Sequence, residues 1–154
     1  MSRAFVKESD EDPGDLAERA LSPHPNLVTA RGLAALEARV RELEERRRTA
    51  RAANDTAGLA VIARDLRYFH SRRESARLVP PPARPEAVRF GVRVQLERPD
   101  GTLLAYRIVG EDEADPAAGL ISYVAPLAKT MLGLHVGDEV EVAGARAVIA
   151  GLEG

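Results

Sequence analysis

Two runs of residues with alternating spacings of three and four most strongly constrain the fold of this chain. The first run comprises Leu33, Leu36, Val40, Leu43, Arg47 and Ala50, and the second comprises Leu59, Ile62, Leu66, Phe69, Arg73 and Ala76. This spacing is the a/d pattern of helices that pack along a seam. Residues 53–58 interrupt the pattern with turn-forming residues. The sequence therefore predicts an antiparallel coiled-coil hairpin, on the order of 30–35 Å long at about 1.5 Å per residue.

The rest of the chain divides at shifts in composition. Residues 1–26 are acidic and rich in proline, which predicts a flexible tail with at most a short helical turn at residues 16–21. The hairpin is expected over residues 27–79, with Thr29 as the N-cap of the first arm and a second arm from about residue 59 to residue 79. Residues 80–85 form a proline-rich linker, because proline stops a helix.

Residues 86–154 change to a periodicity of two, which is typical of strands. We expect strands at residues 88–96, 102–109, 120–124, 139–142 and 145–152, and one short helix from residue 125 to residue 132. The predicted fold class is α+β, with a helical hairpin followed by a small domain of about five strands and one helix.

Opposite charges separate the two parts of the chain. Residues 29–79 contain 12 arginines and 7 acidic residues, a net charge of about +5, whereas residues 86–154 contain 6 basic and 11 acidic residues, about −5. This asymmetry favours a polyanion such as nucleic acid beside the hairpin. The candidate nucleic-acid-facing residues are Arg46, Arg47, Arg48, Arg51, Arg64 and Arg67. The alternative is that these arginines only keep the hairpin soluble.

The sequence offers no catalytic motif of its own. It lacks cysteine, a glycine-rich phosphate loop and a His/Cys metal set, so we expect a protein that is not an enzyme and has no cofactor of its own. The acidic run at residues 111–115 lacks the ligand spacing of a calcium loop and is expected to be a solvated loop. No segment approaches the ~20 apolar residues of a membrane span, and we expect a cytoplasmic monomer.

A series of short motifs in the C-terminal part is specific enough to suggest a family. These motifs are YRIVG at residues 106–110, EAD at 113–115, IS at 121–122, PLA at 126–128, LG at 132–133 and GD at 137–138. Their order after a helical hairpin resembles the GreA/GreB family of bacterial transcript cleavage factors. The resemblance covers residues 27–154, and it is strongest over residues 88–142.

The resemblance implies an FKBP-like C-terminal domain that binds RNA polymerase at the rim of its secondary channel, with the hairpin reaching along nascent RNA toward the active centre. It places Ser122, Tyr123, Ala125, Pro126 and Leu127 at the polymerase-contacting corner. Ala125 stands where the family motif usually has serine. The alternative is that Pro126 and Leu127 only begin and anchor a core helix.

Family members carry an aspartate and a glutamate at the hairpin tip, in a motif like GDLSENAEY, and these carboxylates help to hold the second Mg²⁺ of the polymerase. The tip of this chain comprises Asn54, Asp55 and Thr56, and glycine stands at position 58 where the glutamate is expected. Asp55 is therefore the only candidate ligand for a shared Mg²⁺. We expect a regulator that occupies the channel rather than an efficient cleavage factor. The alternative is an interaction module whose partner is not polymerase.

Overall fold

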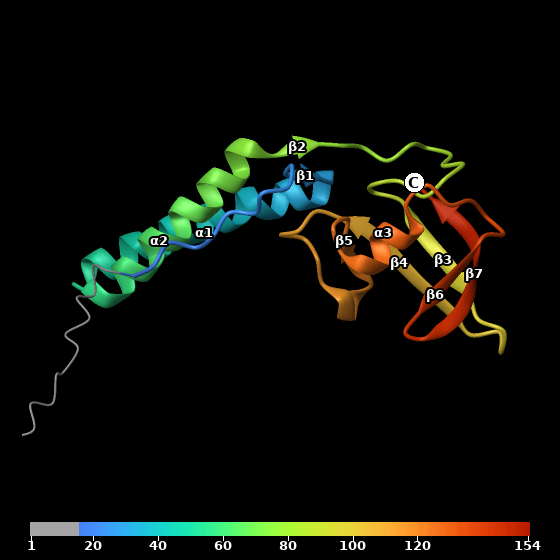
Figure 1. Cartoon of the computed structure of the whole chain (residues 1–154). Helices are drawn as coiled ribbons and strands as arrows, with labels where there is room; N and C mark the ends of the chain where they lie inside the picture. Colours follow the sequence, from blue (N-terminus) through green and yellow to red (C-terminus); the bar gives the residue numbers. More distant parts are fainter. Residues whose placement is uncertain (1–15) are drawn as a thin grey trace, which may run out of the picture.

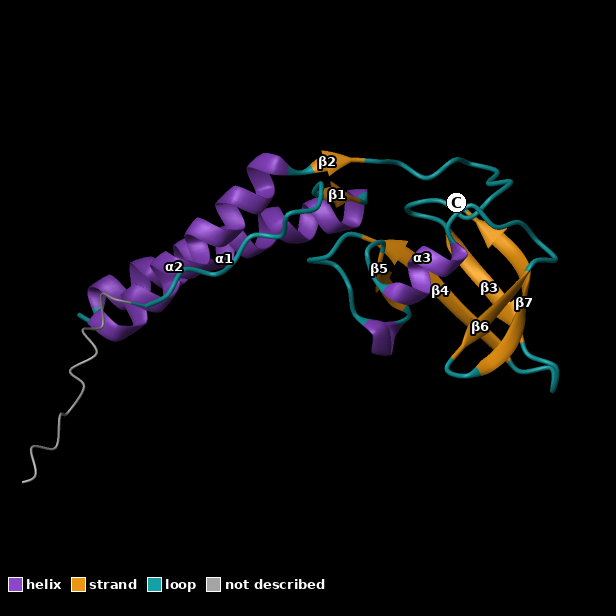
Figure 2. Ribbon diagram, in the orientation of Figure 1, coloured by secondary structure: helices purple, strands orange, loops and turns teal. Residues whose placement is uncertain are grey.

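The computed structural model describes residues 16–154 as a long helical hairpin attached to a small mixed sheet. An extended segment precedes the hairpin, and a non-helical linker connects the hairpin to the sheet (Figure 1 and Figure 2). Residues 1–15 of the predicted tail lie outside the described residues. No helix within residues 16–154 is both long enough and apolar enough to cross a membrane.

The hairpin consists of α1, Ala30–Ala52, and α2, Thr56–Ser75. The buried side chains of its seam are Val40, Leu43, Ala50, Ile62 and Leu66, with Leu59 and Phe69 packed at the edges. The predicted seam is therefore confirmed over most of its length. It is wrong near the end of α2, where Arg73 is exposed and the neighbouring Arg72 is buried instead.

Short parallel strands close the base of the hairpin. Thr29 caps α1 as predicted, because its hydroxyl accepts a hydrogen bond from the Gly32 amide at 3.0 Å. The second arm ends at Ser75 rather than at residue 79, because the following residues leave the helix as β2, Arg77–Leu78. This strand pairs in parallel with β1, Leu27–Val28. Both chain ends of the hairpin are thus tied together by backbone hydrogen bonds.

The extended segment before β1 lies along the hairpin (Figure 1). Residues 16–26 contain no helix, so the helical turn predicted at residues 16–21 is wrong. The sequence predicted a flexible tail, but this part of it instead makes side-chain contacts with α2, for example between Glu18 and Arg67.

Five strands form one curled sheet in the order β5-β4-β3-β7-β6. Their bounds are Arg93–Glu97 for β3, Leu103–Val109 for β4, Leu120–Ser122 for β5, Glu139–Val142 for β6 and Ala145–Glu153 for β7. Only β4 and β5 pair in parallel within this sheet. The five strands and the α-helix α3, Pro126–Met131, confirm the predicted α+β class, and a short 3₁₀ helix, η1, spans Pro116–Ala118 before β5.

The core of this domain lies between one face of the sheet and α3. Val94 and Leu96 of β3 are fully buried there with Met131 of α3, while the alternate residues of β3 face outward. The first strand of this domain was expected to begin at residue 88, but β3 begins five residues later, at Arg93. Val88 instead bonds to the segment after α3, since its amide donates to the Leu134 carbonyl at 2.8 Å. Gly91 and Val92 bond to Ile108 of β4, because the Gly91 amide donates to the Ile108 carbonyl and the Ile108 amide donates to the Val92 carbonyl.

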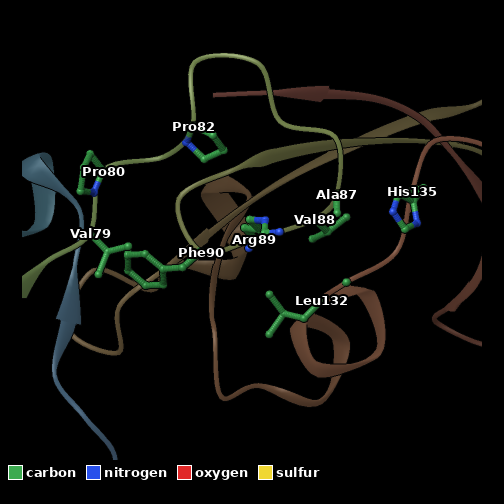
Figure 3. A pocket seen from close by; sticks show the side chains of 10 residues that line it. Val79, Pro80, Pro82, Ala87, Val88, Arg89, Phe90, Leu132 and His135 are labelled. Carbon is green, nitrogen blue, oxygen red and sulfur yellow. The ribbon is translucent and has the colours of Figure 1, made fainter.

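The proline-rich linker packs on the sheet domain. A Cβ at Gly91, which has φ +84°, would lie 3.2 Å from Cβ of Pro81, so the linker approaches the backbone closely. Beside this contact lies an open groove of about 660 Å³. Val79 and Phe90 line one end of the groove and His135 lines the other (Figure 3).

Candidate functional site

The tip of the hairpin is a tight turn whose only acidic residue acts as a helix cap. Asn54 adopts φ 51°, a left-handed conformation that asparagine tolerates better than most residues. Asp55 is the N-cap of α2, and its Oδ1 accepts a hydrogen bond from the Gly58 amide at 2.9 Å. Asn54, Asp55 and Thr56 are all exposed. The structure therefore brings the three predicted tip residues together at the end of the hairpin.

Position 58 is closely covered by the Asp55 carboxylate. A Cβ at Gly58 would lie 2.1 Å from Asp55 Oδ2, so any side chain there would force the capping carboxylate to move. A glutamate at this third helical position is the usual partner of an N-cap in a capping box. The tip thus has one carboxylate that caps its own helix and no second carboxylate beside it.

The tip has too few ligands to hold a metal ion by itself. No group of three His, Cys, Asp or Glu side chains within residues 16–154 has a geometry that could bind a metal. Magnesium is commonly held by one or two carboxylates together with phosphate oxygens and water. Asp55 supplies a single carboxylate, and one of its oxygens is already engaged in the cap.

The six predicted basic residues differ in how far they are neutralised. Arg48 pairs with Glu45, Arg64 pairs with Asp65 at 3.1 Å, and Arg67 pairs with Glu18. Within the described part of the chain, the other three make no ion pair; they are Arg46, Arg47 and Arg51. Of the six candidates, those without an ion pair in residues 16–154 therefore lie on the last two turns of α1, next to the tip.

A buried arginine joins the base of the hairpin to the sheet domain. Arg72 of α2 is 3% exposed. Its Nε donates to Asp112 Oδ2 at 2.6 Å, and its Nη2 donates to Asn26 Oδ1 at 2.8 Å. Tyr68 donates its hydroxyl proton to Asp112 Oδ1 at 2.6 Å. The pKa of Tyr68 is raised from 10.0 to about 12; burial of the phenol is the largest cause, and the hydrogen bond to Asp112 is the second.

The neighbouring carboxylates of the same loop complete this junction. Glu111 Oε1 accepts from the Ser22 hydroxyl at 3.0 Å, and its Oε2 lies 3.8 Å from Arg72 Nη2. Glu113 Oε2 accepts from the Thr29 hydroxyl at 2.6 Å. The expectation of a solvated acidic loop is therefore wrong, because three of its carboxylates bind the base of the hairpin. At this junction, acidic side chains of the negatively charged domain contact the base of the positively charged hairpin.

A glycine allows this close approach of loop and hairpin. A Cβ at Gly110 would lie 2.3 Å from the Leu27 carbonyl oxygen, so no larger residue fits without moving the backbone. Sequence reasoning missed the junction because Arg72 lies one position away from the expected seam residue Arg73. The sequence did contain one signal for the junction: the acidic run at residues 111–115 is opposite in charge to the basic helices of the hairpin.

The predicted polymerase-contacting residues lie together at the corner between β5 and α3. Ser122 ends β5, and Ala125 and Pro126 are the N-cap and first residue of α3. Ala125 makes no side-chain capping bond, as its lack of a hydroxyl predicts. Tyr123 donates its hydroxyl proton to the Pro25 carbonyl and packs edge-on against Phe90, with 5.7 Å between ring centroids. Leu127 is half-buried against the core.

Comparisons with known proteins agree on one family. Residues 83–149 match the family described as "Transcription elongation factor, GreA/GreB, C-term". The chain is 33% identical over 136 residues to transcription elongation factor GreB of Haemophilus influenzae, which covers 76% of this chain and 86% of that protein.

A shorter alignment, with GreB of Xanthomonas axonopodis pv. citri, is 45% identical over 85 residues and spans 54% of this chain and 51% of that protein. A solved structure described as the prokaryotic transcription elongation factor GreA/GreB from Nitrosomonas europaea is 21% identical, with a TM-score of 0.42; the match covers 84% of this chain and 99% of that one.

Proposed function

The chain belongs to the GreA/GreB family of transcription elongation factors, and from this premise we propose that it binds RNA polymerase and occupies the secondary channel without efficiently stimulating RNA cleavage. The hairpin is the part that enters the channel, and the sheet domain is the part that docks at its rim. The result is regulation of elongation by occupancy of the channel.

The observation that carries this proposal is the single carboxylate at the tip. Hydrolysis of a phosphodiester bond by two metal ions requires acidic ligands that hold both cations while the attacking and leaving oxygens are stabilised. Asp55 is already a capping residue, and Gly58 provides no second ligand. A tip of this composition fills space near the active centre but holds an additional Mg²⁺ poorly.

The distribution of charge near the tip supports contact with RNA. Arg46, Arg47 and Arg51 lie within the last seven residues of α1 and make no ion pair within residues 16–154. Arginine binds phosphate groups through its planar guanidinium. In the proposed complex these side chains lie beside the phosphates of nascent RNA, with an affinity that falls as salt rises.

The junction at Arg72 supports a defined reach for the hairpin. An inserted hairpin is useful only if its tip stands at a fixed distance from the surface that docks on the partner. The bond from Arg72 to Asp112 holds the base of the hairpin against the sheet domain, and Asn26 fixes the Arg72 guanidinium from the hairpin side. The corner at Ser122–Leu127 lies on that same domain and is proposed as the docking surface.

A tethered cleavage reagent tests the insertion. The sequence has no cysteine, so a single cysteine at the exposed Thr56 places an iron chelate that generates hydroxyl radicals only at the tip. In complex with core RNA polymerase, the Thr56→Cys conjugate is expected to cut the two largest subunits beside the active centre. The matched control is Glu141→Cys, an exposed position on β6 of the sheet domain. Cuts at the same sites from both conjugates, or cuts only on the outer surface, would contradict insertion.

A further inference from the structure

The extended segment that covers α2 occupies part of the predicted basic surface. We call residues 16–21 the strap. Glu18 of the strap binds Arg67 through both carboxylate oxygens, with Arg67 Nε 2.9 Å from Oε1 and 3.1 Å from Oε2. The hydrogen bond from Arg67 lowers the pKa of Glu18, and the charge of Arg64 adds to the effect. Glu18 therefore lies in the field of two of the six candidate basic residues.

A second residue of the strap covers the adjacent surface of α2. The Arg19 guanidinium lies 4.0 Å from the centroid of the Tyr68 ring and 3.5 Å from Asp65 Oδ1. A guanidinium over an aromatic face is an attractive cation–π contact. The strap thus complements the surface of α2 at two points. Its Glu18 carboxylate binds the basic Arg67, and its Arg19 guanidinium binds the aromatic Tyr68 and the acidic Asp65.

We propose that the strap is an internal competitor of nucleic acid, in which Glu18 holds the site on Arg67 that a phosphate of single-stranded RNA would otherwise take. A carboxylate and a phosphate bind a guanidinium in the same two-pronged geometry, so Arg67 binds one or the other. The proposal rests on the proposed function only in that the hairpin meets RNA.

The contacts of the strap are of the kind that a ligand displaces. The Glu18 and Arg67 side chains are 61% and 56% exposed, and exposed ion pairs stabilise a structure only weakly. The next residues are held much more firmly. Asn26 is buried and donates to the Arg72 carbonyl at 2.6 Å, and Leu27 begins β1. The strap therefore stays tethered beside α2 when it opens, which gives it a high effective concentration as a competitor.

Binding of a labelled 15-nucleotide oligouridine to the full-length protein at low salt tests the proposal. Glu18→Gln is expected to strengthen binding by about two- to fivefold, the range by which exposed ion pairs shift an equilibrium. The dependence of log affinity on log salt should steepen by up to about 0.7, because one more phosphate is neutralised. The control is Glu141→Gln, which makes the same change in net charge on the sheet domain.

A double mutant separates competition from a general effect of charge. In an Arg67→Gln background, Glu18→Gln is expected to leave oligouridine affinity unchanged, because the guanidinium for which Glu18 and a phosphate compete is then absent. An equal gain from Glu18→Gln and Glu141→Gln, or a gain that persists without Arg67, overturns the proposal. No gain from Glu18→Gln overturns it as well. Because the assay contains no polymerase, its outcome is independent of whether the hairpin enters the secondary channel.

Discussion

Replacing Arg72 by methionine should destabilise the protein far more than a change at a typical surface arginine. Arg72 is 3% exposed, and its guanidinium is bound to Asp112 and Asn26. Removing one partner of a buried ion pair costs about 3–5 kcal/mol because the other charge is left buried. The Asp112 side chain remains 17% exposed and regains some water, which lowers the expected cost to about 2–4 kcal/mol.

Urea unfolding followed by circular dichroism at 222 nm measures this cost, since the two hairpin helices dominate that signal. For a protein of this size, each kcal/mol also lowers Tm by about 2–4 °C. The matched control is Arg73→Met, one residue along the same helix, where the side chain is exposed and makes its only side-chain hydrogen bond within residues 16–154 to His70. That variant should stay within about 0.5 kcal/mol of the wild type.

The coupling between the two charges provides a sharper check. Arg72→Met and Asp112→Asn should cost much less together than the sum of their separate effects, because each removes the same interaction. A loss below about 0.5 kcal/mol for Arg72→Met, or strict additivity in the double mutant, would refute the account of a buried junction that holds the hairpin to the sheet domain.

Three further predictions concern the caps and the tyrosine of the junction. Thr29→Val should lower the free energy of unfolding in urea by about 1–2 kcal/mol, because it removes both the α1 cap and the hydrogen bond to Glu113. Thr29→Ser keeps the hydroxyl and should retain most of that stability. Equal losses in the two variants would contradict the capping role of the hydroxyl. Ala125→Ser should add about 0.5–1 kcal/mol by capping α3, and a thermal scan showing no gain would count against the capping argument. The raised pKa of Tyr68, about 12, means that the folded state favours the neutral phenol, so this contribution to stability is complete below pH 10 and is lost as the pH rises toward 12. Phenolate absorbance at 295 nm should show one tyrosine titrating near pH 12 that disappears in Tyr68→Phe and shifts down in Asp112→Asn; a Tyr68 component near pH 10 would contradict it.

The parts of the fold that follow from local periodicity were predictable from sequence. Spacings of three and four place Val40, Leu43 and Ile62 in the seam, and Thr29 is an N-cap in the structure as its side chain suggests. Strand β6, with the sequence EVEV, follows from the alternation of polar and apolar residues. These features depend on neighbours a few residues apart, which a single sequence displays directly.

The features that depend on contacts between distant segments were not predictable in the same way. Arg72 is indistinguishable in sequence from the exposed Arg73, and only its contacts with Asn26 and with Asp112, forty residues later, set it apart. The parallel pairing of β1 with β2 likewise joins residues fifty positions apart. The composition of the tip was visible from sequence, but the capping role of Asp55 required the turn geometry around Asn54.

RNA cleavage in a stalled, backtracked elongation complex, with binding to polymerase measured in the same samples, shows whether the protein occupies the channel without stimulating cleavage. The wild-type protein should bind but should not accelerate cleavage appreciably. Gly58→Glu, which displaces the Asp55 cap and places two carboxylates at the tip, should gain a measurable acceleration. Strong acceleration by the wild-type protein that is lost in Asp55→Ala would contradict the account, because one carboxylate would then be sufficient for cleavage.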